Sequence, residues 1–108
     1  MMNSTQIERL LPLTESTAYI LLALTEPMHG YALMQKVDML SQGTVKLGPG
    51  TLYGAFGWLE RHQWITKVDE YDRRKVYALT DLGRQILIEQ IRRWQIFVDN
   101  GAQALNGK

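Results

Sequence analysis

The most conspicuous chemistry in this sequence comes from three consecutive cations, Arg73, Arg74 and Lys75. They stand beside a predicted hairpin turn, where guanidinium and ammonium groups can neutralise the phosphates of a nucleic acid. Three neighbouring carboxylates balance this charge: Asp69, Glu70 and Asp72. The pattern therefore indicates either a phosphate-binding hairpin or a solvated turn without a ligand, and the charges alone do not separate the two.

A second group of polar side chains lies in and before a helix that we predict from residue 49 to about residue 61. The hydroxyls of Thr51 and Tyr53, with the free backbone N–H groups of a helix N-terminus, can hold a phosphate. Thr51 can alternatively serve only the local turn. Three further side chains are weaker candidates of the same kind: Gln35, Lys36 and Lys46.

The stretch LGPGTLYGAFGWLE, which contains this helix and the residues just before it, carries four glycines. A glycine inside a helix costs roughly 1 kcal/mol relative to alanine, so Gly54 and Gly57 predict a close neighbour. That neighbour is either the backbone or bases of a nucleic acid, or another helix packed against this one. The face opposite the predicted core carries Gly50, Tyr53, Gly54, Gly57, Trp58 and Arg61.

The elements that must position these residues follow from the periodicity of the apolar side chains. Short polar ends flank a helix with Thr14 as N-cap, a second helix that ends at Ser41, and the glycine-containing helix. Two short strands, a charged turn and a long final helix complete the chain. We expect a mainly α fold with a small β-hairpin wing, which is a winged helix-turn-helix whose third helix enters the DNA major groove. The predicted ranges are 14–25, 29–40, 49–61, 64–68, 75–79 and 81–105.

Composition limits the function classes further. A chain of 108 residues with 45% apolar content and a net charge of +1 is one small domain. It has no cysteine and two histidines, so we expect no metal and no other cofactor. Nucleophile and phosphate-loop motifs are also missing from the sequence, which argues against an enzyme. Without a signal-like or membrane-spanning apolar run, we expect a cytoplasmic protein and no membrane partner.

The final helix carries an apolar stripe at heptad spacing. Leu87, Ile91, Trp94 and Val98 form this stripe, and Leu105 continues it less regularly. Such a helix is too long and too apolar to be satisfied within so small a core.

Three segments resemble the signatures of PadR-family transcriptional regulators: HGYALMQ at 29–35, PGTLYGAFGWLE at 49–60 and RRKVYALTDLGR at 73–84. The resemblance covers residues 14 to about 98. It implies a homodimeric bacterial repressor that binds a palindromic operator on double-stranded DNA and releases it when a small molecule or another signal is received. It divides the chain into a DNA-binding part, 1–80, and a C-terminal dimerisation helix with its tail, 81–108. The heptad stripe then holds two subunits together.

The sequence departs from this family at two positions, since Gly54 stands where a proline is usual and Trp58 where a basic residue is usual. Trp94 lies fifteen residues after Leu79, which is similar to the spacing of the tryptophans that stack on flat aromatic drugs in some members. Two interpretations of this region remain: a small aromatic effector binds beside Trp94, Ile91 and Val98, or these residues only pack as an apolar seam. A winged helix that binds only other proteins is the alternative function.

Overall fold

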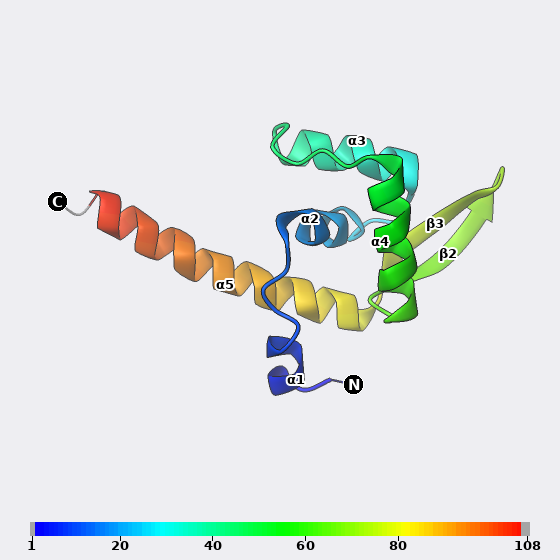
Figure 1. Ribbon diagram of the computed structural model, residues 1–108. Coiled ribbons are helices and arrows are strands. Elements are labelled where there is room, and N and C mark those ends of the chain that lie inside the picture. The colour runs from blue at the N-terminus through cyan, green and yellow to red at the C-terminus, as the bar shows by residue number, and fades with distance from the viewer. Residues whose placement is uncertain (1, 107–108) are drawn as a thin grey trace.

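The order of elements matches the predicted helices, hairpin and long final helix (Figure 1). The computed structural model describes residues 2–106. Its fold class, mainly α with a small antiparallel sheet and a long C-terminal helix, is confirmed. The elements are α1 (Ser4–Glu8), α2 (Glu15–Ala23), β1 (Met28–His29), α3 (Gly30–Leu40), α4 (Pro49–Arg61), β2 (Ile65–Tyr71), β3 (Arg74–Leu79) and α5 (Asp81–Asn106).

The sheet has three antiparallel strands in the order β1-β3-β2, so β3 is central. Strand β1 was not predicted, because two residues are too few to show an alternating pattern. The hairpin is longer than predicted: only Asp72 and Arg73 form its turn, with φ of 51° and 64°. Positive φ at both central residues is the arrangement that matches the twist of a tight hairpin. The hairpin therefore projects as a wing (Figure 1).

Helix α2 occupies the centre of the molecule, between α3 and α5 (Figure 1). Its buried side chains do not form a single stripe, because Ala18 and Leu21 are buried whereas Leu22 is 37% exposed. A helix covered on several sides buries more than one stripe, and the remaining buried positions are Ile20, Ala23 and Leu24.

The N-terminal segment is not merely a polar end, as the sequence suggested. Asn3 and Gln6 form a reciprocal capping box that starts α1, and Ile7 is buried in the core. Helix α1 contacts α5, so the chain before residue 12 helps to anchor the long helix.

The first half of α5 belongs to the core, and its second half extends away from the rest of the chain (Figure 1). Gly83 allows this attachment, because a Cβ there would collide with the carbonyl oxygen of Trp64. Farther along, the buried Gln90 side chain accepts a hydrogen bond from the backbone N–H of Leu13, at 2.6 Å. Of the predicted tail after residue 105, residues 107 and 108 lie outside the described part of the chain.

Candidate nucleic-acid interface

A hollow of about 650 Å³ separates α4 from the wing. One side of α4 and the N-terminal end of α3 form two of its walls, and the wing forms the third. The wing contributes the three predicted cations to this wall: Arg73, Arg74 and Lys75. The structure therefore brings the predicted wing cations and Tyr53 of α4 to the same hollow.

The wing cations are exposed and unpaired within the described residues. None of the three has a carboxylate oxygen within 4.0 Å among the salt bridges of residues 2–106. The nearby Glu70 instead pairs with Lys67 at 2.9 Å, and this hydrogen bond lowers the pKa of Glu70 and raises that of Lys67. The charges of the cations are thus available to an external anion.

The start of α4 also offers free polar groups. Gly48 caps the helix without a side-chain hydrogen bond, and Gly50 and Thr51 are exposed. No hydrogen bond recorded for the described residues uses the Thr51 hydroxyl, so the local-turn interpretation has no contact to support it. A helix N-terminus with free N–H groups favours a negatively charged ligand.

The two interior glycines of α4 have no helix packed against them. A Cβ on Gly54 would point into open space, and one on Gly57 would meet only the Arg61 guanidinium at 3.4 Å. The alternative that a neighbouring helix of the same chain requires these glycines is therefore wrong for the described residues. Tyr53 is exposed as predicted, with its hydroxyl against Gly30 at the start of α3.

Trp58 lies on a different side of α4 from the wing. It stacks on His62 with ring centroids 3.8 Å apart and meets the Trp64 ring edge-on at 5.0 Å. Together with Pro12 and Thr14 it lines a separate apolar recess of about 300 Å³. The position at which the family usually has a basic residue is thus turned away from the hollow.

The other predicted contacts are less well placed. Lys36 and Lys46 form exposed salt bridges, the first with Glu26 at 3.9 Å and the second with Asp38 at 3.6 Å. Gln35 is exposed on α3 but does not line the hollow. Exposed pairs of this kind contribute little, so they leave both lysines able to contact an anion.

A groove of about 470 Å³ runs between α2 and the outer half of α5. It brings together the three predicted ligand-binding residues, Ile91, Trp94 and Val98. Leu87 also lines it but is only 5% exposed, so its side chain is already part of the core. The groove is mainly apolar, and Glu15 supplies a carboxylate.

The predicted dimer stripe is exposed on α5 at Ile91, Val98 and Leu105, but Leu87 is buried in the core of its own chain. A large apolar side chain that the heptad count missed, Phe97, is also exposed on this helix. Leu105 is 84% exposed and Phe97 is 72% exposed. Phe97 follows Trp94 by three residues, so the two side chains are neighbours on the helix surface. The i, i+3 spacing was the signal that could have identified it.

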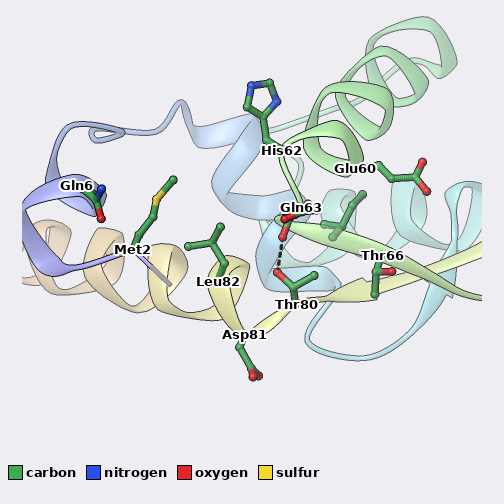
Figure 2. Close-up of a pocket in the computed structure, with 10 residues that line it drawn as sticks. Met2, Gln6, Glu60, His62, Gln63, Thr66, Thr80, Asp81 and Leu82 are labelled. Atoms are coloured by element: carbon green, nitrogen blue, oxygen red, sulfur yellow. Dashed lines mark hydrogen bonds between the residues drawn. The ribbon is translucent and has the colours of Figure 1, made fainter.

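Another hollow, of about 890 Å³, lies where α1, the end of α4, β2 and the start of α5 meet (Figure 2). None of the predicted site residues lines it. Figure 2 shows the Thr80 hydroxyl bonded to the Gln63 carbonyl, a contact of 2.6 Å that joins the start of α5 to the end of α4. Among the described residues no three His, Cys, Asp or Glu side chains are grouped as metal ligands.

Residues 20–89 match the profile described as the transcriptional regulator PadR-like family. The chain belongs to this family. The PadR-like family is one of transcriptional regulators rather than a class of enzymes. No helix in residues 2–106 combines the length and apolar character needed to cross a bilayer.

Three relatives illustrate the match. The PadR-like chain is 39% identical over 69 residues to an uncharacterized 37.1 kDa protein in transposon TN4556 of Streptomyces fradiae, covering 63% of this chain and 19% of that protein. It is 36% identical over 61 residues to the transcriptional regulator YqjI of Escherichia coli, covering 56% of this chain and 30% of YqjI. A PadR-like transcriptional regulator from Bacillus cereus shares the fold, with a TM-score of 0.71 at 21% identity over 97% of this chain and 100% of that one. The match thus spans less than a third of the length of each of the first two relatives.

Proposed function

We propose that this PadR-like chain is a homodimeric repressor that binds a palindromic DNA operator and releases it when a small aromatic effector binds. The observation that carries the DNA part is the set of three unpaired wing cations facing the hollow beside α4. Cations of this kind position a protein on the phosphates, while the side chains of a helix in the major groove read base edges.

The open surface of α4 supports its role as the recognition helix. Gly54 leaves the helix backbone uncovered, and the free N-terminal end with Thr51 and Tyr53 can hold a phosphate. The wing then reaches the flanking backbone, as in other winged helices. Arg61, which is exposed at the far end of α4, adds a further cation on this helix.

The apolar stripe of α5 supports the dimer. Ile91, Phe97, Val98 and Leu105 are large, exposed and carried by one helix that extends beyond its own core. A two-fold pairing of α5 helices would bury them and would present two copies of α4 to successive major grooves, about 34 Å apart. A palindromic operator follows from that symmetry.

The groove between α2 and α5 supports the effector. Its volume of about 470 Å³ lies in the range of small-molecule sites, and the indole of Trp94 offers a face for a planar ring. Glu15 gives the groove a negative charge, which favours a ring that carries a positive charge.

The direct test of the DNA proposal is selection of bound fragments from genomic DNA, followed by affinity measurements on the best fragment and on a random duplex. We expect a shared palindromic sequence and an affinity that falls steeply with salt. Binding without sequence preference and without salt dependence would favour a winged helix that binds only proteins.

The effector proposal is tested by titrating planar cationic dyes while following tryptophan fluorescence and operator affinity. Dye should quench the wild type and weaken its operator binding, and Trp94→Ala should abolish both effects. Trp58→Ala is the matched control, because it removes an indole from the separate recess on α4. Equal responses of Trp94→Ala and the wild type would remove the effector site from this groove.

A further inference from the structure

One side-chain contact joins the recognition helix directly to the wing. The hydroxyl of Tyr77, in the central strand β3, donates a hydrogen bond to Glu60 Oε1 at 3.2 Å. Glu60 belongs to the last turn of α4, and the two residues are seventeen positions apart in the sequence. The contact therefore spans the base of the hollow that separates α4 from the wing.

The Tyr77 side of this contact is rigid. Tyr77 is 6% exposed, and its ring packs on Phe56 of α4 with centroids 4.8 Å apart. Phe56 in turn meets the Tyr53 ring edge-on at 6.0 Å. Burial, with the negative charge of Glu60 as the next cause, raises the pKa of Tyr77, so its hydroxyl remains a donor at neutral pH. Strand β1 covers the other edge of β3, where Met28 pairs with Tyr77.

The negative charge of Glu60 is unfavourable for the binding of a polyanion to this surface. Its carboxylate lines the same hollow as the three wing cations, and a negative charge there opposes the approach of phosphates. Glu60 forms no salt bridge among the described residues; its charge acts on Lys67 only at longer range, and Lys67 already pairs with Glu70. The hydrogen bond from Tyr77 is the one side-chain hydrogen bond that Glu60 makes among the described residues.

We propose that Glu60 and Tyr77 are positioning residues that set the distance between α4 and the wing, and that this distance determines discrimination between operator and random DNA. The pair is called the brace below. The inference rests on the proposed function, because it concerns how the same DNA surface reads its sequence. A helix reads bases only when the phosphate contacts on the wing hold it in register.

The brace is tested first in the free protein, by the distance between α4 and the wing. The chain has no cysteine, so Thr51→Cys and Glu70→Cys provide unique sites for a pair of spin labels. Dilution with excess unlabelled chain restricts the measured distances to one subunit. We expect a narrow distance distribution in the otherwise wild-type chain and a broader or shifted one in Tyr77→Phe, which keeps the ring but removes the donor.

Two variants separate the hydrogen bond from the charge. Glu60→Gln keeps an oxygen that accepts from Tyr77, so its distance distribution should stay narrow, whereas that of Glu60→Leu should broaden. Tyr71→Phe is the matched control, because Tyr71 is exposed on the same hairpin and no recorded contact joins its hydroxyl to Glu60. An unchanged distribution in both Tyr77→Phe and Glu60→Leu overturns the brace.

The second test is the ratio of operator affinity to random-duplex affinity. Loss of one net hydrogen bond should lower this ratio by about threefold to tenfold in Tyr77→Phe. The slope of log K against log salt should fall by less than the ~0.9 expected for one lost phosphate contact. Glu60→Gln should keep the ratio and bind both duplexes more tightly, because a negative charge has left the hollow.

The two measurements distinguish a failure of the brace from a failure of the proposed function. A ratio in Tyr77→Phe equal to that of the wild type, with broadened distances, overturns the link between the brace and discrimination. If the wild-type chain binds no DNA, the proposed function and that link both fail, while the distance measurement still decides whether the brace holds the wing.

Discussion

Replacing Arg73, Arg74 and Lys75 together with glutamine should remove most of the sequence-independent affinity for DNA. Each phosphate contact adds about 0.9 to the slope of log K against log salt, so three lost cations reduce that slope by up to about 2.7 per wing and twice as much per dimer. Between 50 and 200 mM salt, a difference of about 2.7 corresponds to an affinity ratio of roughly 40-fold. We expect the full slope reduction because none of the three cations forms a salt bridge among the described residues, so none must first break an ion pair to contact a phosphate.

Fluorescence anisotropy with a labelled duplex measures this slope on both the operator and a random sequence. The reduction should be equal on the two duplexes, because phosphate contacts carry no direct sequence information. A matched variant with Arg9, Arg84 and Arg93 replaced by glutamine removes the same number of cations from α5 and from the residue after α1, and none of these three forms a salt bridge among the described residues. An unchanged slope in the wing variant, or an equal reduction in the matched variant, would refute the wing as a phosphate clamp.

Three further substitutions test the recognition helix, the attachment of α5 and the dimer. Gly54→Ala should raise the free energy of unfolding by up to roughly 1 kcal/mol, because its Cβ meets open space, while operator affinity falls. A less stable protein with intact affinity would contradict this reading. Gly83→Ala should instead lower the unfolding free energy by about 1–3 kcal/mol in chemical denaturation, since its Cβ collides with the Trp64 carbonyl, and an unchanged midpoint would show that α5 is attached otherwise. Ile91→Asp should give a monomer in sedimentation experiments and lose operator binding. Ile96→Asp is the control and should remain a dimer, because Ile96 is as exposed as Ile91, 49% against 48%, but points about 140° away from it around the helix. A dimeric Ile91→Asp protein would place the interface elsewhere.

The sequence predicted best those elements whose ends carry local signals. The recognition helix begins at Pro49 with Gly48 as N-cap and ends at Arg61, as expected, because proline at the first position and apolar spacing act within a few residues. The wing cations also lie beside the turn where they were predicted. Strand β1 was missed because two residues show no pattern and depend on β3 as a partner, and helix α1 was missed although Asn3 and Gln6 carry the spacing of a capping box.

The candidate site was less predictable because periodicity does not show which neighbour covers each side of a helix. Trp58 and Gly54 share one face of α4, as their spacing of four residues predicted, but that spacing could not show that Trp58 stacks on His62 and meets the Trp64 ring. The contact between Glu60 and Tyr77 was invisible for the same reason, since residues seventeen apart become neighbours only when β3 docks beside α4.

The effector proposal requires a physical route from the groove beside Trp94 to the DNA surface. The two walls of that groove are α2 and α5, and both are hydrogen-bonded or packed to the base of the wing. The carbonyl of Leu24, just after α2, accepts a hydrogen bond from the N–H of Leu79 at the end of β3, at 3.1 Å. At the start of α5, the hydroxyl of Thr80 bonds the carbonyl of Gln63, directly after α4, at 2.6 Å.

A change in the separation of α2 and α5 must therefore strain or move the junction at which α4, β3 and α5 meet. An aromatic ligand can shift the protein only by its difference in affinity between two such arrangements. Removing the Thr80 hydroxyl with Thr80→Val weakens the junction but leaves the groove and the wing cations in place. We expect this variant to bind dye normally and to show a smaller loss of operator affinity at saturating dye. A full response to dye in Thr80→Val would mean that the coupling passes through the dimer interface of α5 and not through the junction.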